Sequence, residues 1–172
     1  MTSGRPMEAE FSPFFAGYVA LVPESDIIGV LEAQRSEVRA LAAAVPPDRE
    51  SFAYAPGKWT IRQVFGHMGD AERVFGHRAF CVSRGEPAVL PSFDENTYVA
   101  AGPSAEISLA ALTQELDLVR ATNLLVLQRL DEAAWQRVGR VSTGEATPRG
   151  IAYVMAGHVR HHFRVLRERY GL

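Results

Sequence analysis

The chain has 172 residues, of which 47% are hydrophobic and 22% are charged, and this fits one globular domain with a buried core. Its formal net charge of −2 argues against a nucleic-acid-binding protein, because such proteins present a positively charged surface. The single cysteine, Cys81, excludes an internal disulfide and favours a cytoplasmic location, and no apolar run is long enough to cross a membrane.

An N-terminal arm and two long helices are predicted in the first half of the chain. The arm takes residues 1–23, and residues 24–172 form the domain. The first long helix is expected over about residues 26–44, where apolar side chains recur with the helical period and two prolines follow. The second is expected over about residues 60–83, because "KWTIRQV" contains a T-x-x-Q capping box at its start.

The second half of the chain predicts two further long helices. One begins near Ser108, a residue that commonly caps a helix N-terminus. The other begins in "TPRG", with Thr147 as the cap and a proline in the first turn, and it ends at Gly171. The apolar stripe of the third helix is predicted at heptad-like spacing, at Leu112, Leu116, Val119, Val126 and Leu130.

A long irregular stretch, "RGEPAVLPSFDENTYVAAGPS", joins the second and third helices over residues 84–104. The part "DENTYVA" is expected to form a short helix. Long loops in compact domains are often functional, so we expect this one to fold back toward the functional site, with Tyr98 as a candidate substrate-binding residue. A packed aromatic residue explains Tyr98 equally well. Together the segments predict an all-α fold, a four-helix bundle with a long connection between its second and third helices.

Two histidines in "GHVRHHFRVL" take the place of core residues in the last helix. His158 and His162 are four residues apart on the apolar face of that helix, whereas His161 is rotated by about 100° toward its flank. Burying two imidazole rings side by side is costly unless their nitrogens find partners, and a metal ion that binds both neutral lone pairs removes this cost. The alternative is a polar flank in which a ring bonds to a backbone carbonyl.

His67 in the second helix supplies the third part of the expected site. It lies at the edge of the buried stripe, and a bundle can bring that edge against the last helix. Alone, it is explained as an isolated histidine at the core boundary. Together, His67, His158 and His162 predict a divalent-metal site, for zinc or nickel, that keeps a position open for water. His77 is expected at the surface.

Three other residues are candidates for the same site, each with a structural alternative. Glu72 projects near the inward side of the second helix and is a candidate general base, or else it forms a buried ion pair with an arginine. Arg78 lies on the same side of that helix as His67 and either binds an anionic substrate or forms a salt bridge at the bundle edge. Asn123 lies on the stripe of the third helix and either contacts the substrate or hydrogen-bonds a neighbour.

Three stretches resemble the DinB-like family, the bundle proteins grouped with YfiT-type metal-dependent hydrolases: "PGKWTIRQVFGHMGDAERVFGHRAFCVSRGE", "LPSFDENTYVA" and "GHVRHHFRVLRERY". The similarity covers residues 18–172 and keeps the order of the segments. The family pattern has one histidine on the second helix and H-x-x-x-H on the last, which this sequence matches at His67, His158 and His162. The resemblance implies a four-helix bundle and a divalent metal held by these histidines.

The resemblance also implies a range of functions. Some relatives are thiol transferases that use mycothiol or bacillithiol, and others resemble maleylpyruvate isomerases. We therefore expect a metal-dependent enzyme that acts on a small-molecule substrate, with a low-molecular-weight thiol as a further partner, either a thiol S-transferase or a hydrolase. The alternative is a non-catalytic bundle that binds a metal or senses a ligand. A homodimer is implied too, and apolar residues on more than one face of the second helix favour it: Phe75, Phe80 and Val82.

Overall fold

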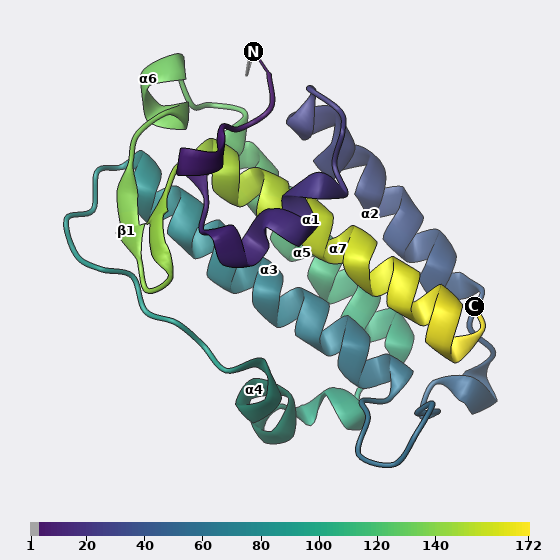
Figure 1. Ribbon diagram of the computed structural model, residues 1–172. Helices are drawn as coiled ribbons and strands as arrows, with labels where there is room; N and C mark the ends of the chain where they lie inside the picture. The colour runs from purple at the N-terminus through teal and green to yellow at the C-terminus, as the bar shows by residue number, and fades with distance from the viewer. Residues whose placement is uncertain (1–3) are drawn as a thin grey trace.

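The computed structural model describes residues 4–172 and contains the four long helices that the sequence predicts (Figure 1). Each begins after a residue whose side chain accepts a hydrogen bond from a backbone N–H of the first turn, a donor that the helix itself leaves free. The predicted capping box at Thr60 is confirmed, as is Gly171, whose φ of 69° ends the last helix. The long helices are α2 (Ile27–Ala43), α3 (Ile61–Ser83), α5 (Leu109–Leu127) and α7 (Pro148–Tyr170).

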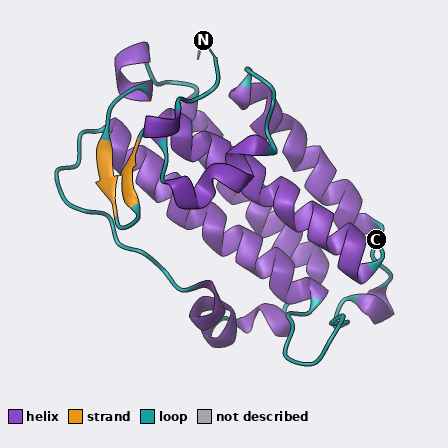
Figure 2. Cartoon of the chain, viewed as in Figure 1, coloured by secondary structure: helices purple, strands orange, loops and turns teal. Residues whose placement is uncertain are grey.

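Short elements lie in the N-terminal arm and in the connections between the long helices (Figure 2). In the turn-rich piece before α7, two strands pair antiparallel, with Arg140 opposite Glu145. The described residues hold no larger sheet, so the predicted all-α bundle is confirmed, and none of their helices is long and apolar enough to cross a membrane. The predicted helix in "DENTYVA" is α4. The short elements are η1 (Glu8–Glu10), η2 (Pro13–Phe15), α1 (Ala16–Ala20), η3 (Pro47–Arg49), α4 (Glu95–Ala101), η4 (Pro103–Ala105), α6 (Glu132–Trp135), β1 (Gly139–Val141) and β2 (Gly144–Ala146).

Helices that follow one another in the chain do not pack as simple neighbours. α3 packs mainly against α5 and α7, and α2 packs against the same two helices. Glu72 contacts Arg120 and, one turn further along both helices, Gly76 contacts Asn123, so α3 and α5 run parallel (Figure 1). The connection between them therefore runs back along the bundle, and a β-bridge to β1 holds part of it. This is the long connection that the sequence predicts.

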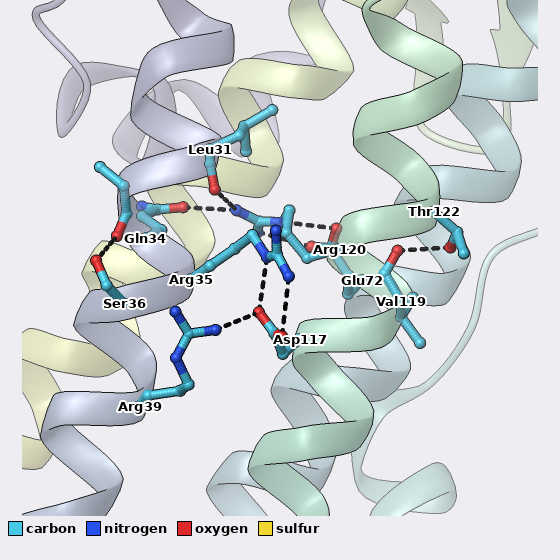
Figure 3. Close-up of polar contacts among 11 residues, drawn as sticks. Leu31, Gln34, Arg35, Ser36, Arg39, Glu72, Asp117, Val119, Arg120 and Thr122 are labelled. Atoms are coloured by element: carbon cyan, nitrogen blue, oxygen red, sulfur yellow. Dashed lines mark hydrogen bonds and ion pairs between the residues drawn. The ribbon is translucent and has the colours of Figure 1, made fainter.

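A layer of polar side chains divides the hydrophobic core into two clusters. Gln34 of α2, Arg120 of α5 and His158 of α7 each lie where the residues of one cluster give way to those of the other. Glu72 of α3 joins this layer, because its two oxygens accept hydrogen bonds of 2.7 and 2.8 Å from Arg120 (Figure 3). Gln34 accepts a hydrogen bond of 2.9 Å from Arg120 and donates one of 2.8 Å to the carbonyl of Ala156. The layer thus links all four long helices at one level.

The inward face of α5 differs from the prediction. Val119 and Val126 are predicted on the buried stripe, but both are only partly buried. Arg120, Leu124 and Leu127 face the core instead. The prediction rests on a heptad-like spacing, and a straight α-helix drifts from such a repeat by about 20° per heptad. The buried face therefore moves to the next residue along the helix.

Two predictions about organisation stay predictions. One is the division into an arm, residues 1–23, and a domain, residues 24–172; the first three residues lie outside the described part of the chain. The other is the homodimer. Phe75 and Val82 belong to the core and offer no outer face, whereas Phe80 is 44% exposed. The argument for an apolar contact surface on α3 therefore rests on Phe80 alone.

The described part of the arm lies along α7 (Figure 1). Two glycines of α7 permit this close approach. A Cβ at Gly150 would lie 1.9 Å from the carbonyl oxygen of Glu10, and one at Gly157 would lie 2.0 Å from that of Tyr18. Arg149 adds a buried ion pair, since it donates hydrogen bonds of 2.8 and 2.5 Å to the two carboxylate oxygens of Glu10. The arm is therefore packed as part of the bundle.

We predict that Gly157→Ala destabilises the protein by about 1–3 kcal/mol, because the added methyl group displaces the backbone of the arm. Gly17→Ala is the matched control. It lies in α1, where an added Cβ meets nothing within 4 Å, so it should leave the melting temperature unchanged or raise it, since alanine favours a helix by about 1 kcal/mol. Calorimetry on both variants tests this. Equal melting temperatures would show that the arm does not pack closely on α7.

Candidate metal centre

Three histidines from two antiparallel helices meet inside the bundle. His158 and His162 are one turn apart on α7, so both rings project from the same face. α3 presents His67 to that face. The ring of Trp59, just before the start of α3, packs beside His67 with 4.8 Å between the ring centres. The sequence thus places all three imidazoles at positions where a bundle normally carries apolar side chains.

The ring nitrogens of the three histidines converge. Nε2 of His158 lies 2.9 Å from Nε2 of His67 and 3.1 Å from Nε2 of His162. One nitrogen from each ring lies within 4.8 Å of the others, and the residues are only 5–8% exposed. Two nitrogens bound to one tetrahedral ion at roughly 2.0–2.1 Å are about 3.3 Å apart. The observed spacing is therefore close to that of ligands on one divalent metal.

Hydrogen bonds among the rings cannot satisfy this arrangement. A neutral imidazole nitrogen is either a donor or an acceptor, so Nε2 of His158 forms at most one well-aligned hydrogen bond with its two neighbours. Nδ1 of His67 is also buried, and no hydrogen-bond partner lies near it among the described residues. A metal ion that binds the three Nε2 lone pairs accounts for their convergence. The donor set therefore fits a divalent metal.

Burial keeps the three rings in the neutral form that binds a metal. It lowers the pKa of His67 from 6.5 to about 4, with a smaller contribution from His161. Burial, followed by His162, His67, His161 and Arg120, brings the pKa of His158 well below its ordinary value. Burial and then the neighbouring histidines do the same to the pKa of His162. At neutral pH the nitrogens therefore have no added proton for a metal to displace.

A cavity of about 480 Å³ opens onto the three histidines, a volume typical of small-molecule sites. A second cavity, of about 260 Å³, shares Trp59, His161 and His162 with the first. The space thus continues on both sides of these side chains. Besides the histidines, the larger cavity is lined by Phe14, Phe15, Tyr18, Trp59, Phe75, Arg78, Ser92, Phe93, Glu95 and Thr143.

The two remaining histidines lie outside the group of converging nitrogens. His161 lines both cavities, and its ring packs against Tyr18 with 5.3 Å between the ring centres. His77 is exposed on α3, near the sulfur of Cys81. Proximity in the sequence therefore does not decide which histidines meet, since His161 is directly beside His162.

Sequence reasoning missed the aromatic wall of the larger cavity. Phe15 and Tyr18 come from the arm, and Phe93 comes from the long connection. Trp59, just before α3, also lines this cavity and packs on His67. The aromatic residues of "FSPFFAGY" do predict that the arm packs on the domain, but they do not show that it packs beside the histidines.

Glu72 does not have a free carboxylate, so its candidate role as a general base is not supported. Both of its oxygens accept hydrogen bonds from Arg120, and one accepts a further hydrogen bond of 2.9 Å from Asn123. The alternative of a buried ion pair is the one that the structure shows for Glu72. Asn123 likewise takes its alternative role, since its amide satisfies Glu72 and packs on Gly76, and it does not line either cavity.

The other two substrate-binding candidates differ in position. Arg78 is buried in the wall of the larger cavity. Tyr98 is 45% exposed on α4 and packs against Phe93, and the connection reaches the cavity through Phe93 and Glu95 instead. The long connection therefore does border the histidines, as expected. Substrate binding by Arg78 and Tyr98 stays a prediction.

Comparisons with known proteins agree with this fold and give the family. Residues 30–166 match the family described as the DinB superfamily. The chain is similar to YfiT from Bacillus subtilis, described as "a probable metal-dependent hydrolase with an unusual four-helix bundle topology", with a TM-score of 0.75 and 18% identity over 98% of this chain and 94% of that one. The resemblance that the sequence motifs indicate is confirmed.

Two structures of the mycothiol-dependent maleylpyruvate isomerase, one of them a mutant, are also similar. Each has a TM-score of 0.67 and 13% identity over 84% of this chain and 61% of that one. At these identities the likeness shows a shared fold and no more. No curated protein sequence matches the chain.

We predict that alanine at His67, His158 or His162 weakens binding of zinc by more than the roughly 10–100-fold that loss of an outer hydrogen-bond partner costs. Each replacement removes one of three converging nitrogens. His161→Ala and His77→Ala are the matched controls and should bind zinc like the wild type. Isothermal titration of metal-free protein measures the affinities, with circular dichroism as the check of folding. Equal affinities across all five variants would contradict the site.

We predict that Glu72→Gln lowers stability and weakens zinc binding much less than alanine at any of the three histidines does, because Glu72 is not one of the converging ligands. Arg120 then keeps its charge in the core without a carboxylate, which costs about 3–5 kcal/mol. The double variant Glu72→Gln with Arg120→Leu should recover part of this loss, because it removes the uncompensated charge. Urea denaturation measures the difference. A stable Glu72→Gln protein with weakened zinc binding would instead give Glu72 a role at the metal.

Proposed function

The chain belongs to the DinB superfamily, and we propose that it is a metal-dependent enzyme that acts on a small molecule at its three-histidine site. The observation that supports this most is the convergence of three buried histidine nitrogens next to a cavity of about 480 Å³. A purely structural zinc site closes with four protein ligands, whereas three leave a position for a ligand from the cavity. Zinc or nickel is the metal we propose.

The described residues offer little that would act as a base in hydrolysis. Glu72 is held by Arg120. Among the described residues that line the two cavities, Glu95 is the only one with a carboxylate, and it lies exposed. A divalent metal at the histidines would lower the pKa of a thiol that it coordinates enough to give a thiolate without a separate base. We therefore favour thiol S-transfer over hydrolysis.

The two cavities support the same choice. They meet at Trp59, His161 and His162, so two different molecules can reach the histidines from two sides. A transferase needs room for a thiol and for an electrophile, while a hydrolase needs room for one organic substrate and water. The aromatic rings of Tyr18 and Phe75 pack on His158 and limit the access of water to it. In this proposal these rings orient the electrophile and keep water from competing with the thiol.

A similar fold also occurs in an isomerase that depends on mycothiol, which makes a low-molecular-weight thiol a reasonable partner to test first. The electrophile is a small organic molecule. We further propose a homodimer and a cytoplasmic location, where such thiols stay reduced.

We predict that the zinc- or nickel-loaded protein joins a low-molecular-weight thiol to monochlorobimane, with release of chloride and a proton, faster than buffer or metal-free protein does. The thiols to test are mycothiol, bacillithiol, glutathione and cysteine, with fluorescence of the conjugate as the measurement. His158→Ala should bring the rate back to that of the buffer, and His77→Ala should keep the wild-type rate, because it leaves the three converging nitrogens intact.

The same preparations should be given a panel of esters and amides. Hydrolysis without thiol transfer would replace the proposed reaction by the hydrolase alternative. Tight metal binding with neither activity would support the non-catalytic alternative, a bundle that binds a metal or senses a ligand.

A further inference from the structure

Three arginines are buried in the described part of the chain, and one of them has no carboxylate partner. Arg78, Arg120 and Arg149 are 4%, 3% and 7% exposed. Arg120 binds both oxygens of Glu72, and Arg149 binds both oxygens of Glu10. This is the usual arrangement, since a buried guanidinium keeps its charge and lowers the stability of the protein unless an opposite charge lies beside it. Arg78 has no such carboxylate among the described residues.

The contacts of Arg78 leave most of its hydrogen-bonding capacity unused. Its Nη2 donates one hydrogen bond of 2.5 Å to the carbonyl oxygen of Pro91. Its Nε is buried and has no hydrogen-bond partner among the described residues. Burial alone lowers the pKa of Arg78, with no contribution from a carboxylate. A space of about 20 Å³ beside it has room for one water, which can accept a hydrogen bond but does not neutralise the charge.

Arg78 lies in the same cavity as the three histidines. On α3 it comes eleven residues after His67, which is close to three full turns, so both project from one face about 16 Å apart along the axis. Phe75 lies between them. Its ring centre is 5.9 Å from Cζ of Arg78 and 5.8 Å from the ring centre of His158. The cavity thus runs from the histidines, past an aromatic wall, to a buried positive charge.

We propose, building on the function proposed above, that the substrate is a small organic acid whose carboxylate binds Arg78 and whose flat apolar part packs on the aromatic wall, with its reactive part toward the histidines. The planar guanidinium donates two parallel hydrogen bonds that match a carboxylate. The charge of one arginine suits a single carboxylate better than a doubly charged phosphate. Glu95, which also lines the cavity, further opposes a doubly charged ligand there.

The test uses 4-fluorobenzoate as the probe and 4-fluorobenzamide as its neutral match, with binding measured by fluorine NMR. Metal-free protein is used, so that no metal can bind the carboxylate. We expect the wild type to bind the benzoate at least about tenfold more tightly than the amide, since hydrogen bonds to charged groups are the stronger ones. Arg78→Met should remove this preference. Arg84→Met, which deletes an exposed positive charge at the end of the same helix, should keep it.

Equal binding of benzoate and benzamide by the wild type would overturn the proposal, as would unchanged benzoate affinity in Arg78→Met. If Arg78→Met does not fold, Arg78→Lys takes its place. It keeps the charge but loses the planar fork, so it should bind benzoate more weakly than the wild type. Because no metal or turnover enters the measurement, the failure of metal binding or thiol transfer leaves its outcome unchanged, and the two proposals fail separately.

Discussion

The ion pair of Arg120 with Glu72 is the interaction on which the arrangement of the bundle depends. Arg120 lies between two apolar clusters, where a charge without partners costs several kcal/mol. Its hydrogen bonds go to Glu72 on α3 and to Gln34 and the carbonyl of Leu31 on α2 (Figure 3). Sliding either helix by one residue, about 1.5 Å, breaks these bonds. The buried charge therefore fixes the register of three helices, which apolar contacts alone define less sharply.

The positions of the three histidines depend on this register of the helices. Gln34 also donates to the carbonyl of Ala156 on α7, two residues before His158. Glu72 lies five residues after His67 on α3. The polar layer thus fixes the positions of α3 and α7, the two helices that carry the histidines, along the bundle axis. A slip of one residue rotates a side chain by about 100°, enough to turn a ring out of the group. The close convergence of the nitrogens follows from bonds made elsewhere in the same layer.

Local signals in the sequence predicted the long helices well, because a cap such as Thr60 and its partner Gln63 are three residues apart and act within one turn. The placement of His158 and His162 on one face followed from the helical period in the same way. Other features depend on contacts between distant residues. Examples are the packing of α2 and α3 against α5 and α7, the ion pair of Glu72, and the packing of Tyr18 on His158. Each joins residues tens of positions apart in the sequence, so no local pattern contains it.

The positive charge of Arg78, which no carboxylate of the described residues balances, decides which ligands the site favours. The charge of Arg120 is balanced by Glu72, and the three histidines are neutral at pH 7 because burial lowers their pKa values. No buried carboxylate lines the larger cavity within the described residues. A divalent metal adds two positive charges to a space where Arg78 already has one. Such a site favours ligands that bring negative charge, and the two proposed ligands do so at its two ends, a thiolate at the histidines and a carboxylate at Arg78.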